Sequence, residues 1–289
     1  MLELLSANAY NMSGSMACAI MASVIGLLTG SFLNVVIHRL PQMMQREADN
    51  YLAHESGRSL LHTDRYDLWA PRSACPHCAA ALACVDKIPV LSYLLLHGRC
   101  RYCRKTIPLR YPVVESFSAL LAGWLGWRFG LGVTGLAALA FAFVLITLSF
   151  IDAQTGLLPD SLTLPLLWLG LLVNLGNIFS PLRDAVIGAV AGYLVLWMIY
   201  WIFRLATGKE GLGYGDFKLL AALGAWLGWQ ALPIILLLSS CLAAAVGITM
   251  VIMRKTAVNQ PLSFGPYLAA AGMLALLYGE SFLYSGLYR

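Results

Sequence analysis

Charged residues are scarce in this 289-residue sequence: Asp, Glu, Lys and Arg together make up 11% of it, and only 14 residues are acidic. Hydrophobic residues make up 60%, and the mean hydropathy is +0.74. A typical soluble domain carries about twice this share of charge. The composition therefore excludes an ordinary soluble protein and indicates an all-α membrane protein with several spans.

A helix needs about 20 apolar residues to cross a bilayer. Eight segments are predicted to do so, and two of them, the second and the sixth, are shorter or interrupted by charge. The segments lie near 15–37, 112–130, 131–151, 161–179, 184–203, 217–231, 232–253 and 264–284. The first lacks a basic region before it and a small-residue cleavage site after it, so it is predicted to be a retained helix rather than a secretory signal.

The distribution of basic residues predicts the orientation, because short cytoplasmic loops are enriched in Lys and Arg. With both termini outside, the inner segments are 38–111, 152–160, 204–216 and 254–263. These segments and the adjoining helix ends hold 16 of the 19 basic residues, including Lys218, Arg254 and Lys255. In the opposite orientation, those 16 basic residues would lie on the outer side of the membrane.

The first predicted span carries small residues four apart, Gly26 and Gly30, which let another helix pack closely. Asn34 is polar at membrane depth, and we interpret it as an interhelical hydrogen bond without a chemical role. Pro41 is predicted to end this helix.

Residues 42–111 form the only stretch long enough for a domain outside the membrane, and its first part, 42–70, is expected to be largely irregular. Two C-x-x-C pairs follow, separated by 21 residues: Cys75 with Cys78, and Cys100 with Cys103. This spacing is typical of a structural zinc site of four thiolates, with iron as an alternative metal. Two disulfides are the competing interpretation, which a reducing cytoplasm disfavours.

Two carboxylates end very apolar segments on the predicted inner side, Asp152 and Asp216. An ionisable group at such a position is costly and is a candidate for function. The competing interpretation is that Asp216 caps one helix and Asp152 simply ends another. Asp160 is predicted to be the N-cap of the following span, and Glu115 is explained by the dipole at a helix N-terminus, with a supporting catalytic role left open.

Glycine surrounds the second carboxylate in the sequence Gly213-Tyr214-Gly215-Asp216. The spacing does not fit a dinucleotide-binding fingerprint, and no βαβ unit surrounds it, so a phosphate-binding loop is not favoured. No nucleic-acid partner is expected. Glycine beside Asp216 instead lets a peptide backbone approach the carboxylate closely.

Together these residues resemble the type IV prepilin peptidases, which are membrane aspartic proteases of the GxGD class. The resemblance runs in order through 30–41, both C-x-x-C pairs, 151–160 and 213–220, without a departure at these positions. It implies a first helix (1–41), a cytoplasmic zinc domain (42–111) and a membrane-embedded peptidase domain (112–289). It also implies that Asp152 and Asp216 are the catalytic pair and that the four cysteines bind zinc.

The same resemblance implies a multi-pass protein of the bacterial inner membrane, in contact with lipid, with its active site at the cytoplasmic face and its termini in the periplasm. Its substrates would be prepilins or pseudopilins, whose basic leader is removed after a glycine. Many members also methylate the new N-terminus with S-adenosylmethionine. The alternatives are a peptidase without methyltransferase activity, or a zinc-stabilised membrane transporter or scaffold, which would not explain why the two aspartates share a face.

Overall fold

The chain forms nine α-helices within the residues that the computed structural model describes, namely 2–75, 77–83, 85–209, 211, 213–253 and 263–287. Three short 3₁₀ helices complete the regular structure, at Val85–Lys87, Asn174–Gly176 and Trp229–Ala231. The described part holds two isolated β-bridges and no strand. The α-helices are α1 (Leu2–Glu55), α2 (Leu91–Leu95), α3 (Arg110–Phe129), α4 (Val133–Thr155), α5 (Asp160–Val173), α6 (Leu182–Thr207), α7 (Tyr214–Leu227), α8 (Leu232–Ile252) and α9 (Gly265–Leu287).

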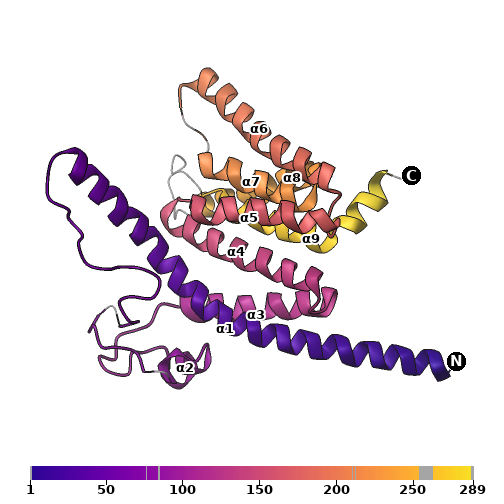
Figure 1. The fold of residues 1–289 in the computed structure, drawn as a ribbon, viewed down its shortest axis with the longest axis horizontal. Coiled ribbons are helices and arrows are strands. Elements are labelled where there is room, and N and C mark those ends of the chain that lie inside the picture. The colour runs from indigo at the N-terminus through magenta and orange to yellow at the C-terminus, as the bar shows by residue number, and fades with distance from the viewer. Residues whose placement is uncertain are drawn as a thin grey trace. The chain divides into compact units, whose positions relative to one another are not determined.

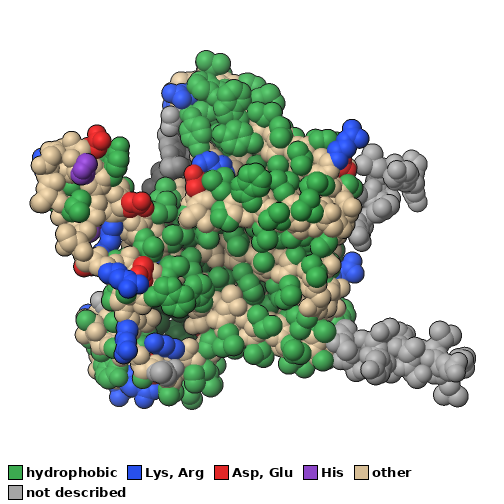
Figure 2. Space-filling view, viewed as in Figure 1, with side chains coloured by type: hydrophobic (Ala, Val, Ile, Leu, Met, Phe, Trp, Pro, Cys, Tyr) green, Lys and Arg blue, Asp and Glu red, His purple; other side chains and the backbone are tan. Residues whose placement is uncertain are grey.

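Several helices are long and apolar enough to cross a membrane. Within the described residues there are four, Met16–Glu55, Val133–Thr155, Leu182–Thr207 and Trp229–Ile252, and two shorter apolar helices accompany them. Hydrophobic side chains cover much of the visible surface of α5 and α6 (Figure 2). The all-α membrane class is therefore confirmed, and the number of eight spans stays a prediction. The predicted inner segment 254–263, with Arg254 and Lys255, lies almost wholly outside the described residues.

The chain divides into two compact units, Met1–Thr147 and Leu148–Arg289. In the first unit α1 and α3 lie side by side (Figure 1). A Cβ atom on Gly26 would lie 2.5 Å from the Ser118 carbonyl oxygen, so the backbones touch at that point, and the predicted close packing is confirmed. The amide nitrogen of Asn34 donates a hydrogen bond of 3.1 Å to the Tyr111 carbonyl of α3, as the sequence indicated.

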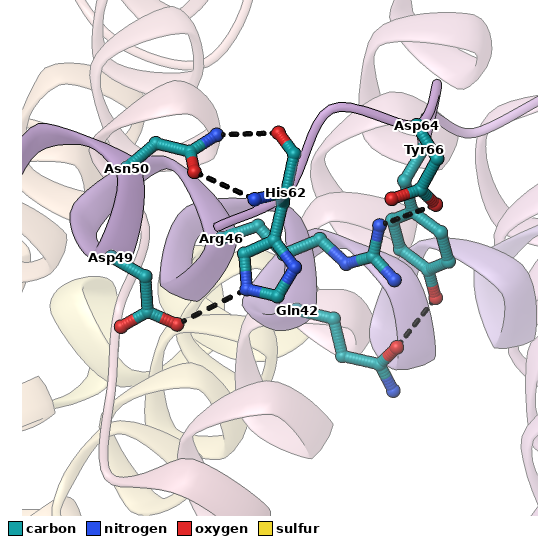
Figure 3. A network of polar contacts seen from close by, with 7 residues as sticks. All are labelled: Gln42, Arg46, Asp49, Asn50, His62, Asp64 and Tyr66. Carbon is teal, nitrogen blue, oxygen red and sulfur yellow. Dashed lines mark hydrogen bonds and ion pairs between the residues drawn. The ribbon is translucent and has the colours of Figure 1, made fainter. Parts of the chain in front are cut away.

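The first helix does not end at Pro41. It continues to Glu55, so that prediction is wrong, and so is the expectation of irregular structure directly after it. The reason is a tertiary one: residues 58–72 return along the helix and bind its polar face (Figure 3). The residues of this contact are Gln42 with Tyr66, Arg46 with Asp64, Asp49 with His62, and Asn50 with the His62 backbone. These bonds offset the backbone hydrogen bond that proline removes.

The second unit is built around α7, which is buried along most of its length and packs against α5, α6 and α9 (Figure 1). Gly188 and Gly224 bring α6 and α7 into backbone contact, because a Cβ atom on Gly188 would lie 2.4 Å from the Gly224 carbonyl oxygen. The Asn174 side chain donates to the carbonyls of Ala225 and Trp226, both at 2.9 Å, and so satisfies the C-terminal end of α7. The helix that carries Asp216 is therefore fixed at its far end as well as along its side.

Candidate active site and metal centre

Asp152 lies in the last turn of α4 and is only 4% exposed. The dipole at a helix C-terminus disfavours negative charge there. The beginning of α9 compensates: the Gly265 N–H donates to the Asp152 carboxylate (Oδ2) at 2.9 Å, and the Ser263 hydroxyl donates to the Asp152 carbonyl at 3.0 Å. Two groups that are more than a hundred residues away in the chain therefore hold this aspartate in place.

Asp216 lies in the first turn of α7 and is 7% exposed. Its carboxylate (Oδ2) accepts a hydrogen bond of 3.3 Å from the Gly213 N–H, which closes the N-terminus of the helix. The helix-capping interpretation is thus correct as local geometry. It leaves the second carboxylate oxygen available for chemistry, so capping and a reactive role are compatible.

The two aspartates share one buried site in the second unit. The Leu158 side chain contacts the backbone beside each aspartate: a Cβ atom on Gly215, next to Asp216, would be 2.7 Å from Leu158 Cβ, and one on Gly265, whose N–H binds Asp152, would be 3.2 Å from Leu158 Cδ1. Only glycine permits this approach of the backbone on both sides. Both carboxylates that the sequence analysis paired thus lie beside backbone that packs on Leu158, and their joint catalytic role stays a prediction.

Asp160 has a different position from the one predicted. Pro159 is the N-cap of α5, and Asp160 is the first residue of the helix, so its assignment as the cap is wrong by one position. Its carboxylate accepts hydrogen bonds from the Lys218 ammonium at 2.6 and 2.7 Å. The ring of Pro159 fixes its backbone φ angle, and this residue occupies the cap position without a side-chain hydrogen bond. The Asp160 carboxylate binds Lys218 of α7 instead.

Glu115 also differs from its prediction. It lies beyond the first turn of α3, so the helix dipole does not explain it. Its carboxylate (Oε2) accepts a hydrogen bond of 2.7 Å from the Val90 N–H in the segment between the cysteine pairs. Glu115 therefore ties the segment between the cysteine pairs to α3.

Sequence analysis missed the contribution of Ser263 and Gly265. A signal for it is present: Pro266 stands directly after Gly265, and proline in the first turn is a typical helix start. This signal fixes where α9 begins. It does not show that the beginning of α9 reaches Asp152, which depends on the packing of the second unit.

The four cysteines form two similar loops. In the first, the Cys75 N–H donates to the Ala80 carbonyl and the Ala79 N–H donates back to Cys75; in the second, Cys100 makes the same exchange with Lys105 and Arg104. Ala79 and Arg104 both adopt positive φ angles, 55° and 59°. The His77 N–H also points at the Cys75 sulfur and helps to lower the pKa of this thiol to about 7.

The geometry of the four sulfur atoms fits a metal ion. The sulfur atoms of Cys75, Cys78, Cys100 and Cys103 all lie within 4.8 Å of one another, and those of Cys75 and Cys103 are 3.8 Å apart. Zinc–sulfur bonds of about 2.3 Å in a tetrahedron place sulfur atoms about 3.8 Å apart. A disulfide would need about 2.05 Å, and all four cysteines are unbridged. The cluster can hold a tetrahedral metal ion.

These features define a class: an all-helical membrane protein with two buried carboxylates in its second unit and, in its first unit, four cysteines that can hold a metal ion. Two family models match the chain, the bacterial peptidase A24 N-terminal domain over residues 24–129 and the type IV leader peptidase family over residues 139–248. No solved structure matches the chain.

Curated relatives extend the match over most of the chain. The prepilin leader peptidase/N-methyltransferase of Aeromonas salmonicida is 55% identical over 261 residues, which cover 89% of this chain and 90% of the relative. The protein of the same name from Pseudomonas aeruginosa is 48% identical over 275 residues, 94% of each chain. The chain therefore belongs to the type IV leader peptidase family.

Proposed function

We propose that the protein removes the basic leader of type IV prepilins or pseudopilins after a glycine, and that it then methylates the new N-terminal amine. The observation that carries this proposal is the buried pair of carboxylates, Asp152 and Asp216, held in one site by backbone groups. The relatives' names supply the substrate and the second activity.

The reaction needs no nucleophilic side chain. Two carboxyl groups in one buried site share a proton, because two like charges there repel each other. The ionised group takes a proton from a water molecule, which attacks the scissile carbonyl carbon, while the protonated group donates a hydrogen bond to the carbonyl oxygen. This is the pattern of the aspartic proteases. The Gly213 and Gly265 N–H groups orient the two carboxylates.

We assign Cys75, Cys78, Cys100 and Cys103 to a zinc ion with a structural role. Four thiolates complete the coordination shell and leave no position for substrate. A cytoplasmic location keeps the thiols reduced and able to bind. S-adenosylmethionine, the methyl donor, would supply an electrophilic methyl group to the second reaction.

We also propose the membrane arrangement that the basic residues indicate: eight spans in the bacterial inner membrane, both termini in the periplasm, and the carboxylates at the cytoplasmic face. The domain division at 1–41, 42–111 and 112–289 belongs to this proposal. The anionic inner leaflet would attract the basic leader of a prepilin to this face, while its apolar part lies among the spans.

The test is a mass measurement on the products. Purified protein in lipid nanodiscs is incubated with a prepilin, with and without S-adenosylmethionine. We expect loss of the leader in both reactions and the additional mass of one CH₂ group only when the methyl donor is present. Cleavage without that gain would leave a peptidase alone, and an intact prepilin in both reactions would contradict the proposed function.

A further inference from the structure

A cavity of about 1020 Å³ lies within the first unit. Its walls come from α1, from the segment that carries the two cysteine pairs, and from the beginning of α3. Binding sites for small molecules and cofactors typically have volumes of about 300–1,000 Å³. The cavity is therefore large enough for a nucleoside with a further polar chain.

Asn34 offers this cavity an unsatisfied acceptor. The residue lines the cavity and is 2% exposed. Its amide nitrogen donates to the Tyr111 carbonyl, but its side-chain oxygen has no hydrogen-bond partner among the described residues. A buried acceptor without a donor costs about 1–3 kcal/mol. This oxygen indicates that a ligand with N–H or O–H groups belongs in the cavity.

The cavity also contains buried charges of both signs. Glu115 and Arg39 line it, and each is 8% exposed. The Arg39 guanidinium donates to the carbonyls of Asp67 and Pro71, at 2.8 and 2.6 Å, and has no carboxylate partner within the described part of the chain. A buried charge without a counter-ion is unfavourable. A negative group on a ligand would compensate Arg39, and a positive group on the same ligand would interact with Glu115.

We propose that this cavity is the binding site for S-adenosylmethionine, an inference that rests on the methyltransferase part of the proposed function. The ligand carries a sulfonium and an ammonium group, which Glu115 attracts, and a carboxylate, which Arg39 attracts. The Asn34 oxygen accepts a hydrogen bond from the ammonium group or a ribose hydroxyl. The ring of Tyr93 lines the cavity and offers a surface on which adenine stacks.

The transfer itself balances without a further reactant. The deprotonated N-terminal amine of the cleaved substrate attacks the methyl carbon, the carbon–sulfur bond breaks, and its electron pair stays on sulfur as S-adenosylhomocysteine. Water takes up the proton that the amine loses. The residues of the cavity bind and orient the donor.

This assignment gives the metal site a defined purpose. Cys75 and Cys100 line the same cavity, so the metal ion would fix the wall that faces the donor. Glu115 fixes that wall at a second point, through its bond to the Val90 N–H.

The test measures binding directly. Full-length protein in detergent is titrated with radiolabelled S-adenosylmethionine by equilibrium dialysis, and ultraviolet crosslinking followed by peptide mass mapping locates the label. We expect Glu115→Gln to weaken binding at least about tenfold, because it removes a charge but keeps the shape. Glu47→Gln is the matched control, since Glu47 is an exposed residue of α1 outside the cavity, and it should bind as the wild type does. Equal zinc content and melting temperature establish that both variants are folded.

In the wild-type protein the label should map to peptides from 31–39, 71–108 or 110–115. Three results would overturn the assignment. The label could be confined to other peptides, or Glu115→Gln could bind as tightly as the wild type. The third is a co-purified phospholipid in the cavity that S-adenosylmethionine does not displace. The proposed function fails separately, if the protein neither shortens nor methylates a prepilin in the product assay. A protein that methylates but carries the label elsewhere contradicts the cavity assignment alone.

Discussion

Replacing Gly265 with alanine tests whether the beginning of α9 positions the catalytic pair. The added Cβ atom would lie 2.6 Å from the Asp152 carboxylate oxygen. A carbon–oxygen contact normally measures about 3.3 Å or more, so the carboxylate must move by about 0.7 Å. A misplacement of about 1 Å at a reacting group costs about 100-fold in rate. The backbone N–H is retained, so the loss would come from position and not from a missing hydrogen bond.

We expect Gly265→Ala to lower kcat/KM for prepilin cleavage by about 100-fold while the protein stays folded. The matched control is Gly272→Ala in the same helix, whose Cβ atom would lie 2.5 Å from a methyl group of Leu223. Both variants overpack α9, which typically costs about 1–3 kcal/mol of stability, but only the first touches a carboxylate. Cleavage rates and melting temperatures are compared for the three proteins. Near wild-type cleavage by Gly265→Ala, or an equal loss in both variants, would refute the positioning role.

Three further predictions concern the segment outside the membrane. Serine at Cys75 and Cys78 should remove the metal, measured by elemental analysis, and should reduce methylation more than cleavage; loss of cleavage in a folded double variant would place the metal in the peptidase site. Single cysteines introduced into 42–111 should react with a membrane-impermeant thiol reagent only from the cytoplasmic face, and labelling from the periplasm would reverse the orientation. The hydrogen bond from Arg65, together with backbone N–H groups, lowers the pKa of Asp67 from 3.8 to about 2, so its stabilising effect is complete above pH 3.8 and is lost as the pH falls through 2. Amide exchange in this loop should follow that course, and a loss of protection already between pH 6 and pH 5 would contradict it.

The sequence predicted most of what depends on local pattern. Its composition indicated membrane helices. Gly26 indicated the contact with α3, because a helix position without a side chain lets a second helix backbone approach closely. The pairing of Asp152 with Asp216 followed from the cost of placing a charge beside an apolar segment. The cysteine cluster followed from ligand spacing alone.

The errors share one physical cause, which is tertiary contact. Pro41 is a helix breaker by its own chemistry, but the returning segment 58–72 holds the helix beyond it. Glu115 and Asp160 were explained by the helices that carry them, whereas their partners lie on other segments. The contact of Gly265 with Asp152 joins residues 113 positions apart, and no local pattern encodes it.

The central claim is that Asp152 and Asp216 together activate water. Its most direct test is prepilin cleavage by three variants, Asp152→Asn, Asp216→Asn and Asp160→Asn, in folded, membrane-inserted protein. The first two should abolish cleavage, because a neutral amide cannot take the proton from water. The third should cleave nearly as the wild type does, since the half-exposed ion pair of Asp160 with Lys218 is worth less than about 1 kcal/mol. Cleavage near the wild-type rate by Asp152→Asn or Asp216→Asn, above all with an inactive Asp160→Asn, would contradict the claim.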